Sequence, residues 1–234
     1  MNGLDKRNVE VSATEYEGAL RLLEERLRFD IRERWGWGDD VAVKTLQHLR
    51  GREEPRLLFS PDNLPTIARL AKEKDPSEHA REEEIADNAV QGRLYGASNP
   101  YCRRFIEVDR NSFDFSTYEH ADPQTIHGLN RHRWYAALAR TYWLERNPAY
   151  FYALMREWDF FAEKVPLPGE SLFQQLHGAG GHARMPTPYH ELDNFIRLTN
   201  WWWGFWLALY AEEMTPERCV VLLARCLRLF DLVA

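Results

Sequence analysis

The chain has 234 residues, of which 44% are hydrophobic and 28% are charged, so it can bury one sizeable core and a disordered chain is excluded. Its formal net charge of −6 provides no general positive field, so we expect no nucleic-acid partner. Cys102, Cys219 and Cys226 are too few for a disulfide framework and are predicted to be small buried residues.

The first residues, MNGLDKRNVEVSATEYE, contain no apolar stretch typical of a signal peptide. No segment approaches the roughly 18 apolar residues that a membrane-spanning helix needs. We therefore expect no membrane partner, and the sequence indicates no particular compartment.

The first predicted helix begins at Ser12 and Glu15, which have the spacing of a capping box, and continues over residues 15–35. A shorter helix is predicted over 39–50, followed by a strand-like triplet at 57–59.

Two further helices are predicted over residues 60–75 and 78–94. The segment 95–122 mixes turn formers with short apolar pairs, which predicts loops and at most one edge strand.

A helical hairpin is predicted from residue 125 onward. One helix is expected over 125–146, and Asn147 and Pro148 then form a helix N-cap and a first-turn proline. The second helix carries a continuous apolar stripe of Phe151, Leu154, Met155, Trp158, Phe161 and Ala162.

After a loop rich in Pro and Gly over 165–190, the helix predicted over 191–213 is apolar around most of its circumference, which indicates an interior helix. Its main apolar side comprises Leu192, Phe195, Ile196, Thr199, Trp202, Trp203, Trp206, Leu209 and Tyr210. The last helix begins at Thr215 and Pro216 and has no cap signal before Ala234, so we expect the natural chain to continue. Repeated hairpins favour a stacked or toroidal all-α architecture.

The segment NRHRWYAALARTYWLERNPAYFYALMREWDFF resembles the signature hairpin of the heparinase II/III-like polysaccharide lyases, of the heparinase III type. ELDNFIRLTNWWWGFW and TPERCVVLLARCLRLF resemble the next two helices of that family, so the resemblance covers residues 123–234. It implies an incomplete α/α toroid over 61–234, preceded by an N-terminal helical arm over 1–60.

The resemblance also implies a function: cleavage by β-elimination of uronic-acid polysaccharides such as heparan sulfate or alginate, with an acidic polysaccharide or oligosaccharide as partner. The family's catalytic residues and β-sandwich are expected beyond Ala234, in the missing C-terminal part of the same chain. No catalytic residue is therefore assigned here. Many family members are exported, but no signal peptide is present in this sequence.

The sequence suggests substrate contacts on two helices. A polar seam within aromatic surroundings comprises Asp193, Arg197, Asn200 and Gly204. From it we predict Arg197 and Asn200 as glycan-facing groups, the alternative being an internal Arg197–Asp193 ion pair. Trp201, the tryptophan nearest the seam, is the one kept as a sugar-stacking candidate. A second predicted cluster shares one face at the start of the helix predicted over 125–146 and consists of His127, Asn130, Arg131 and Trp134, the alternative being a helix-end cluster that hydrogen-bonds its own loop.

No metal or other cofactor is predicted, because the spacing of His177, His182 and His190 matches no zinc pattern. One alternative function is a non-catalytic glycan-binding or scaffold module. A third is another α/α-toroid carbohydrate enzyme, an unsaturated glucuronyl hydrolase, but no pair of carboxylates stands out as its acid and base.

Overall fold

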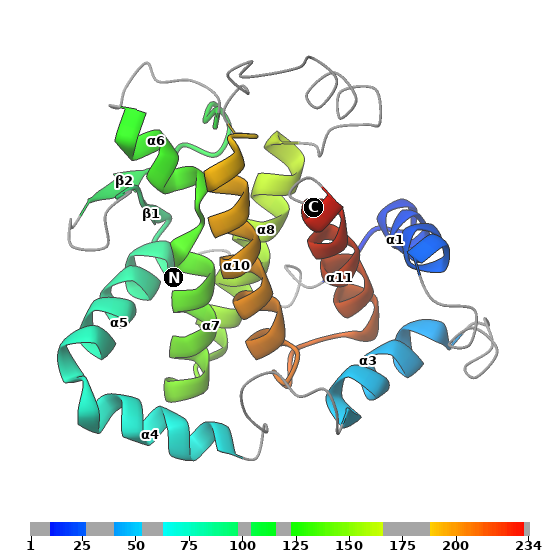
Figure 1. Cartoon of the computed structure of the whole chain (residues 1–234), viewed down its shortest axis with the longest axis horizontal. Coiled ribbons are helices and arrows are strands. Elements are labelled where there is room, and N and C mark those ends of the chain that lie inside the picture. Colours follow the sequence, from blue (N-terminus) through cyan, green and yellow to red (C-terminus); the bar gives the residue numbers. More distant parts are fainter. Residues whose placement is uncertain are drawn as a thin grey trace.

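The computed structural model describes residues 10–26, 40–52, 63–97, 104–115, 123–165 and 188–231 (Figure 1). These residues are mostly helical, which confirms the predicted all-α class. The helices are α1 (Ala13–Arg26), α3 (Val41–Gly51), α4 (Leu64–Lys74), α5 (Pro76–Val90), α6 (Pro123–Asn130), α7 (Arg133–Glu145), α8 (Pro148–Lys164), α10 (Glu191–Ala208) and α11 (Pro216–Asp231). The strands are β1 (Arg93–Tyr95) and β2 (Phe105–Glu107). None of the described helices is long and apolar enough to cross a membrane.

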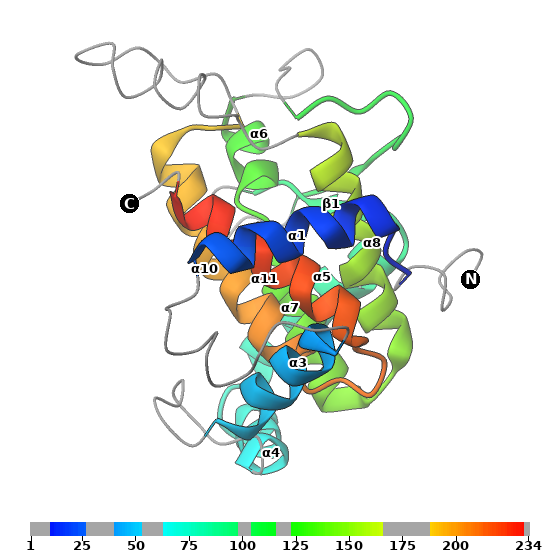
Figure 2. The same ribbon diagram turned by 90° about the vertical axis from the view of Figure 1, so that its right-hand side faces the viewer.

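Helix α7 is the centre of the packing, since it contacts α4, α5, α8 and α10 (Figure 1). Consecutive helices α7 and α8 form an antiparallel hairpin, and α10 and α11 form another. Helices α1 and α3 both pack on α11, and α1 crosses it in Figure 2. A small apolar cluster joins them, formed by Ala19, Leu23, Ala42, Val220, Val221 and Ala224. The division into an arm over 1–60 and a toroid over 61–234 stays a prediction.

The predicted helix starts are confirmed by their caps. The backbone N–H of Glu15 donates to Ser12 Oγ at 3.2 Å, and that of Ala149 donates to Asn147 Oδ1 at 3.0 Å. The N–H of Arg218 donates to Thr215 Oγ1 at 3.2 Å. Each cap gives a partner to a backbone donor that the helix itself leaves unpaired. The strand-like triplet 57–59 lies outside the described residues.

A two-stranded hairpin replaces the end of the helix predicted over 78–94. Helix α5 ends at Val90, and Gly92 has a φ of 84°, a backbone conformation that suits glycine. Strand β1 follows and pairs antiparallel with β2, with Leu94 opposite Ile106. The sequence indicated only one edge strand in this region, because each strand is three residues long and shows little alternation.

The single helix predicted over 125–146 is wrong, because the chain breaks between α6 and α7. Helix α6 ends at Asn130, and His132 adopts a left-handed conformation with a φ of 52°. Such a conformation is unfavourable for most side chains and here coincides with complete burial of the imidazole. The indole Nε1–H of Trp201 donates to His132 Nδ1 at 2.8 Å. The break therefore rests on a tertiary contact that no local pattern contains.

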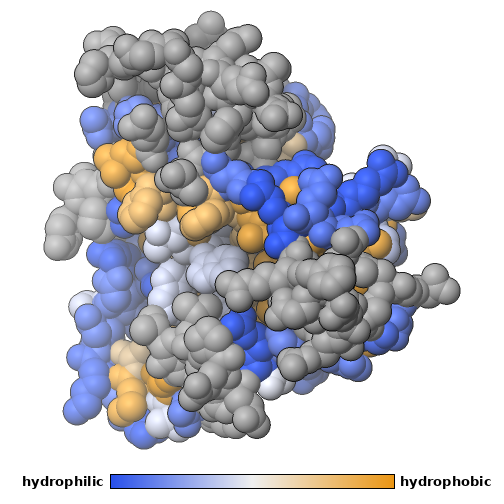
Figure 3. Space-filling view, turned by 45° about the vertical axis from the view of Figure 1, so that its right-hand side comes forward, coloured by the Kyte–Doolittle hydropathy of each residue, from blue (hydrophilic) through white to orange (hydrophobic). Residues whose placement is uncertain are grey.

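Helix α10 is buried along its second half, where Trp206 and, at the C-cap, Leu209 lie in the core, but its first turns depart from the predicted interior helix. Leu192 and Phe195, from its predicted buried side, are 52% and 62% exposed, whereas Asp193 and Arg197 of the polar seam are fully buried. The exposed side continues into an apolar groove of about 500 Å³ between α10 and α11, lined in part by Trp202, Trp206, Leu227 and Phe230. Figure 3 shows exposed hydrophobic residues on this face of the molecule, bordered by hydrophilic surface.

A substitution at Gly128 tests the close approach of α6 to the segment after β1. A Cβ at this position would lie 2.4 Å from the carbonyl oxygen of Gly96, so the backbone itself would have to move. We expect Gly128→Ala to lower the free energy of unfolding by about 1–3 kcal/mol in urea denaturation. Gly18→Ala on α1, where a Cβ meets nothing within 4 Å, is the matched control and should raise it by about 0.5–1 kcal/mol. Equal effects of the two substitutions would contradict this packing.

Candidate functional site

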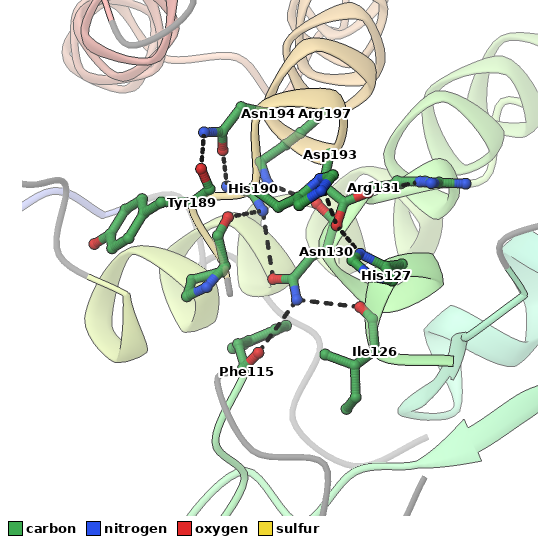
Figure 4. A network of polar contacts seen from close by, with 11 residues as sticks. Phe115, Ile126, His127, Asn130, Arg131, Tyr189, His190, Asp193, Asn194 and Arg197 are labelled. Carbon is green, nitrogen blue, oxygen red and sulfur yellow. Dashed lines mark hydrogen bonds and ion pairs between the residues drawn. The ribbon is translucent and has the colours of Figure 1, made fainter. Parts of the chain in front are cut away.

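The candidate site is a cluster of charged and imidazole groups where α6, the turn after it and the first turn of α10 meet (Figure 4). Asp193 is fully buried there. His127 Nδ1 lies 2.5 Å from Asp193 Oδ2, and Arg131 Nε donates to Asp193 Oδ1 at 2.8 Å. The side chains of His127 and Arg131 are 21% and 13% exposed. A buried carboxylate thus holds two groups that reach the surface.

His190 completes the cluster. It is the N-cap residue of α10, and its Nδ1 lies 4.0 Å from Asp193 Oδ2. Its ring and that of His127 are 5.0 Å apart between centroids, in an edge-to-face arrangement. Two imidazoles, one of them from α6, and one carboxylate therefore converge at the start of α10.

Beneath the cluster lies the fully buried guanidinium of Arg197, shown in Figure 4. Its Nε donates to the carbonyl of Asn130 at 2.7 Å, and its terminal nitrogens donate to Asn194 Oδ1 at 3.0 Å and to the carbonyl of Pro188 at 2.8 Å. Burial lowers the pKa of Arg197 to about 10, and the nearby Asp193 opposes this shift, so the group stays charged at neutral pH. These bonds join α10 to the end of α6 and to the segment that enters α10.

Asn130 extends this buried network. Its Oδ1 accepts from Arg197 at 3.3 Å, and its Nδ2 donates to the carbonyls of Phe115 at 3.2 Å and Ile126 at 3.1 Å. The side chain therefore has a partner at both ends, as a buried amide requires.

The structure divides the seven predicted substrate contacts into two groups. His127, Arg131 and Asn200 are partly exposed, and Asn200 Nδ2 donates to the carbonyl of Arg131 at 2.8 Å, so these three lie together. The other four are buried, and we propose that they support the site and do not touch a glycan: Asn130, Trp134, Arg197 and Trp201.

Arg197 and Asp193, considered from the sequence as an alternative ion pair, are each paired with other groups in the structure. Asp193 binds His127 and Arg131, while Arg197 takes backbone and amide oxygens. The i, i+4 spacing on α10 suggested the pair, but partners from a segment more than 60 residues away in the sequence replaced it.

Sequence reasoning missed His190 and the role of Asp193. His190 was grouped with His177 and His182, which lie outside the described residues. The signal that could have found it is the i, i+3 spacing of His190 and Asp193 at a helix start, where both face the same way. Pairing with His127 needed the tertiary structure.

The arrangement has two chemical capacities. An imidazole oriented by a buried carboxylate can take up or release a proton at its other nitrogen. The three side chains of His127, His190 and Asp193 also offer ligand atoms that lie within 4.8 Å of one another, which is the kind of donor set that holds a metal ion.

Comparison with known proteins adds no assignment: no protein-family model, no curated protein and no solved structure matches this chain. The family resemblance drawn from the sequence therefore stays a proposal.

The buried imidazole of His132 predicts a pH dependence of stability. Burial, with the charge of Arg197 adding to it, holds the pKa of His132 well below its ordinary value. Below about pH 6.5 the unfolded chain therefore binds a proton that the folded chain does not, and stability falls as the pH falls. Between pH 7.5 and 5.5 we expect this residue to account for a loss of about 1.3 kcal/mol.

His132→Asn tests this, because asparagine tolerates the left-handed conformation but does not titrate. Urea unfolding of both proteins at the two pH values should show a smaller pH effect in the variant, whatever its absolute stability. An unchanged pH effect would contradict a proton-free His132 in the folded state.

Proposed function

We propose that the chain is the glycan-binding helical part of a polysaccharide lyase that cleaves uronic-acid-containing glycans, heparan sulfate-like or alginate-like, by β-elimination. The resemblance over residues 123–234 supports this proposal, as do the antiparallel hairpins α7–α8 and α10–α11, which would be successive units of an incomplete α/α toroid.

The observation that carries the proposal is the exposure of His127 and Arg131 above a buried Asp193. Because the carboxylate is fully buried, a ligand meets the imidazole and the guanidinium here and not the negative charge. A guanidinium group is suited to bind carboxylates and sulfates through charge-assisted hydrogen bonds, and an imidazole N–H can donate to the same groups. The adjacent amide of Asn200 adds a polar group suited to sugar hydroxyls.

His127 and Arg131 would serve substrate binding, which is one part of a lyase reaction. β-Elimination of a uronide needs the carboxylate neutralised so that the C5 proton becomes acidic, together with a base and an acid. Arg131 and His127 would bind the acidic groups of the glycan and orient the chain. The base and the acid would come from the remainder of the longer enzyme, as the family resemblance implies.

A glycan-binding module without lyase activity is the second candidate. It is favoured by the observation that the side chains of His127 and Arg131 are already anchored to Asp193, as in a fixed recognition surface. The two candidates share the binding site and differ in whether a longer form of the protein cleaves the glycan.

Glycan binding provides the test. In buffer containing a chelator, calorimetric titration should show tighter binding of heparan sulfate or alginate hexasaccharides than of a neutral hexasaccharide. We expect His127→Ala and Arg131→Gln each to weaken binding about tenfold, a typical loss for one hydrogen bond to a charged group. Absorbance of the unsaturated uronide product should stay flat with this chain alone.

Arg69→Ala is the control, because Arg69 is an exposed arginine on α4 that is ion-paired with Glu73. It should leave glycan affinity unchanged, and circular dichroism should show that all variants are folded. Equal binding of the neutral hexasaccharide, or an equal loss with Arg69→Ala, would refute the proposed site.

A further inference from the structure

The convergence of His127, His190 and Asp193 goes beyond the needs of glycan binding. Their ligand atoms lie within 4.8 Å of one another, and they come from α6, the N-cap of α10 and its first turn. Two imidazoles and one carboxylate form a donor set that suits zinc and neighbouring transition metals, and it leaves a fourth position open.

An unsatisfied atom points to the same centre. His190 Nδ1 is enclosed, although its side chain is 45% exposed, and it has no hydrogen-bond partner among the described residues. The atom nearest to it in the cluster is Asp193 Oδ2, at 4.0 Å. Buried polar atoms are rarely left without a partner, and a bound ion would provide one.

The distances need only a small adjustment. Tetrahedral ligands at about 2.0–2.2 Å from zinc lie about 3.3 Å from one another. The separations of Asp193 Oδ2 from His127 Nδ1 and His190 Nδ1 are 2.5 Å and 4.0 Å, one shorter and one longer than that value. Both imidazoles are partly exposed and can turn, whereas the carboxylate is held by Arg131 Nε on its other oxygen.

The surrounding charges set the expected affinity and selectivity. Arg131 orients Oδ2 toward the histidines but, like the nearby Arg197 and the N-terminus of α10, opposes a cation. The ion must therefore gain most of its binding energy from the imidazoles. This favours zinc, nickel and cobalt and disfavours magnesium and calcium, which prefer oxygen ligands.

We propose that His127, His190 and Asp193 form a mononuclear divalent transition-metal site with one open coordination position. The site shares His127 with the proposed glycan-binding surface, but it does not rest on that function, since it can fill in the absence of any saccharide.

Metal titration tests the proposal directly. The chain is stripped with a chelator, dialysed and titrated with zinc chloride by calorimetry and with cobalt chloride by visible absorption, without glycan. We expect one equivalent of zinc to bind with a Kd on the order of micromolar, weaker than a structural zinc site because of the neighbouring arginines. Cobalt should give the visible bands of a low-coordinate ion, and magnesium should give no binding heat.

His190→Ala is the decisive variant, because His190 is half-exposed at a helix N-cap and its loss should leave the fold intact. We expect it and His127→Ala each to weaken zinc binding by at least tenfold. His79→Ala, which removes a histidine near Glu83 on α5, is the matched control and should have no effect. A double change of His177 and His182 to Ala should also leave the affinity unchanged.

Three outcomes would overturn the site: no zinc binding, zinc binding that survives His190→Ala, or binding that the double change at His177 and His182 abolishes. Since glycan binding is measured with a chelator present and metal binding without glycan, failure of one proposal leaves the other standing.

Discussion

The described structure depends above all on the buried guanidinium of Arg197. Removing this charge from water is costly, and the protein compensates by giving it oxygen partners from three directions: the end of α6, the carbonyl of Pro188 and the side chain of Asn194. Each of these oxygens in turn accepts a hydrogen bond that water would otherwise donate. The geometry of the cluster follows, because α6 and α10 cannot slide past one another without stranding a buried charge.

The hydrogen bonds of Arg197 explain how a polar site can lie on otherwise apolar helices. Asp193 is one helical turn from Arg197, so fixing Arg197 also fixes the carboxylate that holds His127 and Arg131. The close contact of Gly128 with Gly96 holds α6 against the segment after β1, and the left-handed His132, hydrogen-bonded to Trp201, joins the end of α6 to α10. Recognition of an acidic sugar and binding of a metal ion would both use partly exposed side chains whose positions are fixed by the buried Asp193 and Arg197.

The sequence predicted the elements that depend on local chemistry. Ser12, Asn147 and Thr215 cap helices where their side chains indicated, since a cap involves only residues within one turn.

Prediction from the sequence failed where a contact with a residue far away in the sequence determines the local structure. Nothing near His132 predicts a helix break, because Trp201 supplies the contact. The exposure of Leu192 and Phe195 at the start of α10 was not predicted, because Asp193 and Arg197 turn this end of the helix toward partners on a distant segment. The same reasoning found His127 and Arg131 as a pair but not their common carboxylate.

The hydrogen bond from Arg197 to the carbonyl of Pro188 has one more consequence. It anchors the backbone two residues before His190, so the point at which the chain enters α10 is defined independently of the length of the connection that precedes it. Evolution or engineering can lengthen or shorten that connection while the imidazole of His190 keeps its place.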